Sequence, residues 1–349
     1  MKPPARRRHP PSWWGLGAMV VAAGMVVLLL VLLPAGGVRA GSPGGAQLKP
    51  VTLILQWMPQ SQFAGYYMAK EKGFYAENGL DVTILRGGPD RDQIAYLRDG
   101  RADFATLFLT GALIYRDRGV PLVHLTQVVN RSNLMLVARA EREITEVGDL
   151  DGRRVSLWGE AFRAAYLGWF HASGVAPLIT PQYYSVNLFL RGGVDACAAM
   201  YYNEYHVLYQ SGVDWDEMVT FFMHEQGFDF PEDGIYCLES TLAADPESCR
   251  AFAEASLQGW AYAAAHPEET LQVVMREVRA AHVPTNSTHQ EWMLRTILPS
   301  IVPTARDDWQ LGELSPEDYM RTIVTLQGEF IISPSAAPFD RFHPWGSAR

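Results

Sequence analysis

Short apolar runs alternate with amphipathic stretches over the first third of the chain. Val51–Leu55 is the first apolar run and predicts a buried strand, and a helical pattern follows over 63–72. The same pattern predicts further strands at 81–85, 104–108, 121–129 and 134–139, and helices at 92–99 and 112–118. Strands that alternate with helices in this way indicate a parallel sheet covered by helices.

The alternation starts again after a short polar connector at 147–154, which predicts a second α/β lobe. Its elements are strands at 155–158, 182–185, 196–200 and 219–223 and helices at 164–172 and 187–190. Residues 228–232 are predicted to cross back, and a strand at 234–238 to rejoin the first lobe. Helical patterns dominate afterwards, at 247–265, 267–278, 290–298 and 316–327.

We therefore expect two lobes joined by two crossings. The first lobe is assigned to 49–140 plus 234–333, the second to 141–233, and an irregular, proline-rich tail to 334–349. The interface between two such lobes is a favoured place for a small-molecule site.

The N-terminus has the pattern of a secretory signal. Basic residues at positions 2 and 6–8 precede an uncharged apolar run over 13–33, and Val38-Arg39-Ala40 fits a cleavage site. We expect a signal peptide over 1–40, a leader over 41–48, and a periplasmic location. The alternative is an uncleaved membrane anchor, because the apolar run is long enough to span a bilayer.

Composition excludes some classes of protein and leaves others open. The net charge is −9 and the basic residues are scattered, which argues against a nucleic-acid partner. No phosphate-binding loop, nucleophile elbow or zinc-protease motif is present. Three cysteines lack metal-ligand spacing; Cys237 and Cys249 form a disulfide in one alternative, and all three are buried thiols in the other.

Polar and aromatic residues gather after the predicted strands, where open α/β sheets bind ligands. Rings available for stacking are Trp57, Tyr66 and Trp158, while Gln62, Asn203 and Glu204 offer hydrogen bonds. Thr110 is expected to cap a helix that faces the ligand, and Glu160 to follow the first strand of the second lobe.

Several motifs resemble those of a known family. They are Leu55-Gln-Trp-Met-Pro, Gly65-Tyr-Tyr, Gly73-Phe-Tyr, Gly100-Arg-Ala-Asp and Leu150-Asp-Gly-Arg-Arg. Together they are similar to the thiamine-pyrimidine branch of extracytoplasmic solute-binding proteins, which is grouped with the nitrate, sulfonate and taurine binders. The resemblance implies a type II periplasmic-binding-protein fold and delivery of a small heteroaromatic solute, a thiamine pyrimidine precursor, to the permease of an ABC importer.

The resemblance also implies roles for single residues. Trp57 falls where the family stacks on the pyrimidine ring, and Glu204 where an acidic residue binds the amino group. Tyr67, with Tyr66 beside it, matches the aromatic of the helix start, and Gly87 and Gly88 match the glycine-rich loop.

The resemblance extends to the fungal pyrimidine synthase, which is the enzymatic alternative. Phe63 stands where that enzyme has a histidine, so we expect binding and not catalysis, with no cofactor and no metal. Another alternative is the same fold binding an alkanesulfonate or nitrate-like anion, which Arg86 and Arg163 would favour. A membrane-tethered sensor remains if the N-terminal segment is retained.

Overall fold

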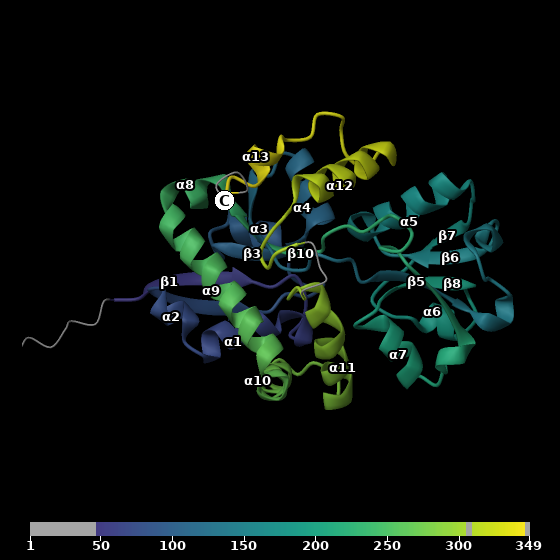
Figure 1. The fold of residues 1–349 in the computed structure, drawn as a ribbon, viewed down its shortest axis with the longest axis horizontal. Coiled ribbons are helices and arrows are strands. Elements are labelled where there is room, and N and C mark those ends of the chain that lie inside the picture. Colours follow the sequence, from purple (N-terminus) through teal and green to yellow (C-terminus); the bar gives the residue numbers. More distant parts are fainter. Residues whose placement is uncertain (1–46, 305–308, 346–349) are drawn as a thin grey trace, which may run out of the picture. The chain divides into compact units, whose positions relative to one another are not determined.

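Two five-stranded sheets form the framework of the computed structural model, which describes residues 47–304 and 309–345 (Figure 1). The first sheet contains β1 (Lys49–Ile54), β2 (Leu80–Leu85), β3 (Phe104–Phe108), β4 (Leu122–Gln127) and β10 (Asp233–Leu238). The second contains β5 (Leu134–Arg139), β6 (Arg154–Leu157), β7 (Leu178–Pro181), β8 (Ala196–Met200) and β9 (Met218–Phe222). The strand orders are β2-β1-β3-β10-β4 and β7-β6-β8-β5-β9.

Both sheets are mixed, and the parallel arrangement expected for the first strands is confirmed for β1, β2 and β3. Strand β1 runs parallel to β2 and β3, but β10 lies antiparallel to both β3 and β4. The second sheet repeats this, because β5 is antiparallel to β8 and β9 while β6 is parallel to β7 and β8. In each sheet the antiparallel strand is the one that has just crossed from the other lobe and therefore arrives from the opposite end.

Helices cover both sheets. Those of the first lobe and the C-terminal region are α1 (Ala64–Glu71), α2 (Phe74–Glu77), α3 (Gln93–Arg98), α4 (Leu109–Asp117), α8 (Glu239–Ala244), α9 (Pro246–Ala265), α10 (Pro267–Ala280), α11 (Ser287–Ile297), α12 (Pro316–Gly328) and α13 (Phe339–Phe342). Those of the second lobe are α5 (Glu160–Ser173), α6 (Asn187–Leu190) and α7 (Glu204–Gln210). A 3₁₀ turn, Ser61–Phe63, precedes α1.

Helices α1 and α9 pack in near-backbone contact in the core of the first lobe. A methyl group on Gly65 would lie 2.2 Å from the buried Trp260 ring, and one on Gly259 would lie 2.1 Å from the Gly65 carbonyl oxygen. Cores are packed to the density of crystals, so neither position has room for a side chain. This contact explains Gly65 in the Gly-Tyr-Tyr motif.

The two lobes are joined by residues 128–133 and 223–232, which are hydrogen-bonded to each other. The amides of Val128 and Val129 each donate to the Asp233 carbonyl oxygen at 2.9 Å, and the Glu232 amide donates to Val129 at 2.8 Å. The Glu232 carboxylate is buried and accepts hydrogen bonds from Ser132 Oγ and from the backbone and side chain of Asn133.

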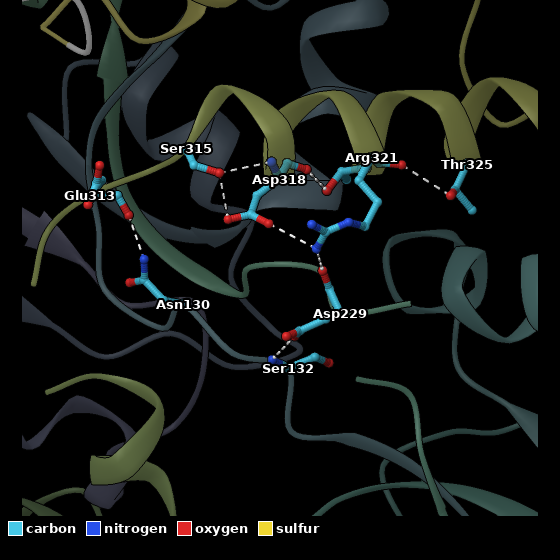
Figure 2. Close-up of polar contacts among 9 residues, drawn as sticks. Asn130, Ser132, Asp229, Glu313, Ser315, Asp318, Arg321 and Thr325 are labelled. Carbon is cyan, nitrogen blue, oxygen red and sulfur yellow. Dashed lines mark hydrogen bonds and ion pairs between the residues drawn. The ribbon is translucent and has the colours of Figure 1, made fainter. Parts of the chain in front are cut away.

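Helix α12 and the segment just before it are fastened to the two crossings (Figure 2). Arg321 pairs with Asp318 of the same helix and donates to the Asp229 carbonyl oxygen on the returning crossing at 2.9 Å. The Asp229 carboxylate in turn accepts from the Ser132 amide on the other crossing at 2.7 Å. Asn130 donates to the Glu313 carbonyl oxygen just before the helix.

The structure corrects three predicted boundaries. Strand β5 belongs to the second sheet, so the first crossing ends near residue 133 and not at 140. The strand expected at 182–185 is β7, which ends at Pro181. The tail expected to be irregular contains α13, whose Phe342 is fully buried against the first lobe.

All three cysteines are buried free thiols, so the disulfide alternative is not formed. The predicted signal peptide at 1–40 lies outside the described residues, as does most of the leader. Within the parts of the chain that are described, no helix combines the length and apolarity needed to cross a bilayer.

Burial raises the pKa of Glu232 to about 8, with the neighbouring Asp233 charge as a further cause. An unfolded glutamate titrates near ~4.3, so between these values the folded protein binds more protons than the unfolded one. We expect the free energy of unfolding of the wild type, relative to Glu232→Gln, to fall as pH rises from about 4.3 to about 8. Urea denaturation at several pH values measures this difference.

The control is Glu225→Gln, because Glu225 lies in the same crossing but is exposed. It should leave the pH dependence as in the wild type. A Glu232→Gln variant whose stability follows the wild-type pH profile would contradict the assignment of this titration to Glu232.

Candidate ligand-binding site

A cavity of about 880 Å³ lies between the lobes. Its first wall comes from the turn after β1, the loop after β2 and the start of α4. Its second wall comes from the residues that follow β6, β7 and β8. The predicted placement of polar residues after strands therefore applies to both lobes.

The turn after β1 is held rigidly by residues from distant parts of the chain. The Gln56 amide donates to Thr106 Oγ1 on β3 at 2.8 Å. The buried Ser61 amide donates to Gln290 Oε1 at 2.7 Å, and Ser61 Oγ donates to the Gln290 carbonyl oxygen. Helix α11 thus fixes the backbone from which Trp57 and the glutamines project.

A buried carboxylate organises the glutamines of this wall. Asp233, the first residue of β10, accepts Gln56 Nε2 at 2.6 Å and Gln62 Nε2 at 2.8 Å. Gln60 Nε2 in turn donates to Gln62 Oε1 at 2.6 Å. Burial raises the pKa of Asp233 to about 7, and the two amide donors partly offset this.

Two aromatic rings meet across the cleft. Trp57 from the first lobe and Tyr184 from the second have ring centroids 4.9 Å apart with planes tilted by 44°. A ligand ring stacked between them would need about 7 Å, twice an ordinary contact distance. The rings must therefore separate before a flat ligand can lie between them. Tyr184 is two-thirds exposed, with 67% of its surface accessible, so it is free to move.

The second wall presents a carboxylate. Glu204, at the start of α7, accepts the Met200 amide at 3.0 Å and Asn203 Nδ2 at 2.8 Å. Removal from solvent raises the pKa of Glu204 to about 7, although part of the side chain is open to the cleft. Each oxygen can accept a further hydrogen bond, which a ligand N–H group would supply.

Helix α11 also supports the second wall. His289 Nε2 lies 3.0 Å from Asn203 Oδ1, and its Nδ1 lies 2.9 Å from Nδ1 of His206 on α7. Burial, with the neighbouring His206 as a second cause, lowers the pKa of His289 to about 4, so this contact involves neutral rings. One helix therefore holds Ser61 of the first wall through Gln290 and Asn203 of the second through His289.

Most charges around the cleft are neutralised by protein partners. Arg86 forms two parallel hydrogen bonds with Asp90, and Glu160 pairs with Arg118. Arg163 lines the cleft, and within the described residues its guanidinium has no ion-pair partner. It could face an acceptor or an anionic group on a ligand.

The structure brings seven of the residues singled out from the sequence to the cleft: Trp57, Gln62, Gly88, Trp158, Glu160, Asn203 and Glu204. Four others lie elsewhere: Tyr66, Tyr67, Gly87 and Thr110. The structure thus corrects the expected cleft positions of these four.

Packing explains each of the four. Tyr66 and Tyr67 are buried in the core, and Tyr66 meets the edge of Trp260 in α9. Gly87 packs against the first strand, since a methyl group there would lie 2.0 Å from the Leu55 carbonyl oxygen. Thr110 lies inside the first turn of α4, so it is not a cap, and its hydroxyl donates to the Ala161 carbonyl oxygen of the other lobe.

Sequence reasoning missed Tyr184 and Asp233. Tyr184 stands in a loop that was predicted as a strand, and its neighbour Tyr183 is also exposed and lines the cleft. Asp233 was placed between the crossing at 228–232 and the strand at 234–238, as the last residue of the second lobe. The available signal was a lone acidic residue at the start of an apolar strand. A carboxylate in that position is buried and needs dedicated hydrogen-bond partners, which the polar turn can supply.

The profile of the family described as NMT1/THI5 like matches residues 60–270. The chain belongs to the NMT1/THI5-like family. The matched range runs from the turn after β1 to the start of α10 and so includes most residues of both cleft walls. Two curated relatives match this chain over most of their own length.

The riboflavin-binding protein RibY of Chloroflexus aurantiacus is 26% identical over 303 residues, 84% of each chain. The formylaminopyrimidine-binding protein of Halalkalibacterium halodurans is 27% identical over 266 residues, 72% of this chain and 77% of the relative. Among solved structures, the periplasmic aliphatic sulphonate binding protein SsuA from Escherichia coli has a TM-score of 0.67 at 11% identity, covering 85% of this chain and 98% of that one. This NMT1/THI5-like protein thus has the periplasmic-binding-protein fold with two α/β lobes.

Replacing Gln290 by alanine should destabilise the protein by about 1–3 kcal/mol, because the buried Ser61 amide would lose its acceptor. Urea denaturation measures the loss, and hydrogen exchange at Ser61 should speed up more than exchange in β3. Glu291→Ala is the matched control, since Glu291 is the exposed neighbour in α11. Equal stability of the two variants would show that this hydrogen bond does not hold the turn.

Proposed function

We propose that this protein is the extracytoplasmic solute-binding component of an ABC importer and that it captures a small heteroaromatic ligand by closure of the two lobes. The ligand we propose is an aminopyrimidine related to the thiamine precursors. Trp57 stacks on its ring, and Glu204 and Asn203 bind its polar edge from the second lobe. Export, and a permease that receives the ligand, are parts of the same proposal.

The observation that carries this proposal is a pair of aromatic rings over a cleft that has a buried carboxylate behind one wall and a second carboxylate on the other. Trp57 and Tyr184 meet across the opening, with Asp233 behind one wall and Glu204 on the other. Flat rings with amino or ring N–H groups satisfy both features, since stacking uses the face and hydrogen bonding uses the edge. The name of the Halalkalibacterium halodurans relative supports this class of ligand.

Riboflavin is the second candidate ligand. It is supported by the name of the Chloroflexus aurantiacus relative, which matches over a larger share of both chains. The cleft volume of about 880 Å³ lies within the range of drug-sized ligand sites and would admit a three-ring compound. Titration with each compound distinguishes the two candidate ligands. The outcome changes the identity of the ligand and not the proposed solute-binding role.

An alkanesulfonate or nitrate-like anion is a weaker candidate. Of the two arginines that would favour it, Arg86 is neutralised by Asp90 and does not line the cleft. Arg163 lines it, but Glu204 stands on the same wall with a desolvated carboxylate. An anion would have to lie near that carboxylate at an energetic cost.

An enzymatic role is also less well supported. Phe63, at the position where the fungal synthase has a histidine, is fully buried in the core of the first lobe and supplies no polar group to the cleft. Binding without chemistry therefore accounts for the cleft residues with fewer assumptions.

Replacement of Trp57 by alanine should weaken aminopyrimidine binding by about tenfold or more, because a base–aromatic stack contributes about 1–3 kcal/mol in nucleic-acid binders. Isothermal titration calorimetry with 4-amino-5-hydroxymethyl-2-methylpyrimidine measures the change. Trp57→Phe should retain most of the affinity. The control is Trp215→Ala, since Trp215 is partly exposed outside the cleft. An unchanged affinity in Trp57→Ala would refute the stacking role.

Replacement of Tyr184 by alanine should increase the association rate about two- to tenfold. Tyr184 contacts Trp57, and an aromatic pair of this kind contributes about 0.5–1.5 kcal/mol that must be lost before a ligand ring enters between them. Stopped-flow tryptophan fluorescence measures the rate. Tyr184→Phe keeps the ring and should behave as the wild type. An association rate that does not change in Tyr184→Ala would mean that this contact does not gate the cleft.

A further inference from the structure

Asp233 occupies an unusual position for a charged residue. It is 2% exposed, and among the described residues no lysine or arginine pairs with it. Its two oxygens are taken by two amide nitrogens of the cleft wall, Gln56 Nε2 on Oδ1 and Gln62 Nε2 on Oδ2. Asp233 therefore accepts at both oxygens, and both side-chain amides turn their nitrogen toward it.

The orientation of these amides decides what the wall offers to a ligand. With its nitrogen at Asp233, Gln62 directs Oε1 to Gln60, whose Nε2 donates to it. Gln93 is likewise oriented, since its nitrogen donates to the carbonyl oxygens of Leu55 and Gln56 at 3.3 Å. The oxygens of Gln56, Gln60 and Gln93 have no protein donor among the described contacts and belong to residues that line the cleft.

We infer that Asp233 is a specificity-determining residue: it orients the glutamines of the first lobe so that the wall accepts hydrogen bonds, and thereby selects ligands whose edge carries N–H donors. It does not touch the ligand itself and acts through Gln56, Gln62 and Gln60. The inference deepens the proposed function and rests on it, because it names the chemistry of the ligand edge.

The opposite wall also presents an acceptor, beside the donor Arg163. Asn203 uses one N–H on Glu204 and its oxygen on His289, so its second N–H remains for a ligand. Glu204 is left as an acceptor facing the cleft. A ligand that donates to both Glu204 and the glutamine oxygens suits the cleft, which an aminopyrimidine does with the two N–H groups of its amino nitrogen. A flavin dioxo edge, with one N–H between two carbonyl oxygens, does so less well, and a sulfonate does not.

The neighbouring Glu232 provides a matched control for this role. It is buried to the same extent, 2% exposed, but its oxygens accept from Ser132 and Asn133 of the crossing and not from the glutamines. Asp233→Asn and Glu232→Gln each replace one buried carboxylate by its amide. Only Asp233→Asn gives the cleft glutamines a partner that also donates a hydrogen bond. The side-chain amides of the glutamines can then reverse and turn their oxygens toward residue 233.

The test compares two probes that differ at one group: 4-amino-5-hydroxymethyl-2-methylpyrimidine and the analogue in which a methyl group replaces the amino group. Their dissociation constants are measured by calorimetry for wild type, Asp233→Asn and Glu232→Gln. Wild type should prefer the amino compound by about tenfold or more, as expected for a lost hydrogen bond at an acceptor-lined site. Glu232→Gln should keep this preference, whereas Asp233→Asn should lose most of it.

Gln62→Met is a second variant in case Asp233→Asn does not fold, because it breaks the link from Asp233 to Gln60 without adding a charge. It should reduce the preference for the amino compound. An unchanged preference in whichever of these two variants folds would overturn the role of Asp233 while leaving the proposed function intact. If wild type binds neither probe, the proposed aminopyrimidine ligand fails, and the inference fails with it.

Discussion

Two consecutive carboxylates, Glu232 and Asp233, are buried at the point where the chain returns to the first lobe, and much of the structure serves to satisfy them. A buried carboxyl group without a nearby cation needs hydrogen-bond partners for its oxygens. Glu232 takes its donors from the other crossing, which aligns the two connections between the lobes. Asp233 takes its donors from the turn after the first strand, which shapes the cleft. The connection between lobes and the polarity of the site are thus set by adjacent residues.

The alternation of strands and helices was sufficient to predict two α/β lobes joined by two crossings, because each element buries an apolar face with its own period. It could not predict strand direction. Strands β10 and β5 run antiparallel to their neighbours because each enters its sheet directly after the chain crosses between the lobes. A run of apolar residues does not indicate where the chain crosses. The same limit explains the misplaced lobe boundary, since β5 has the apolar pattern of its neighbours in sequence but pairs with β8 and β9.

For the candidate site, the residues that follow strands were predictable, and those whose position depends on packing between distant segments were not. Trp57 and Glu204 project directly from strand ends. Tyr66 and Tyr67 stand near Trp57 in the sequence, but both are buried in the core, and α9 covers Tyr66 beside the Gly65–Gly259 contact. Tyr184 reaches the cleft from a loop, and the support that α11 gives to both walls joins residues more than eighty positions apart in sequence. No local pattern encodes such pairings.

Helix α12 contacts the connection between the lobes but not the ligand cleft, whereas in many binding proteins the same residues serve both. Its Arg321 contacts the returning crossing at Asp229, and Asn130 of the other crossing contacts Glu313 just before the helix (Figure 2). None of the residues of α12 lines the cleft. Under the proposed closure about these crossings, substitutions in α12 would change the balance between open and closed forms without changing which ligand fits. Natural variation there would tune how much solute is retained at a given concentration, while the choice of solute stays with the cleft.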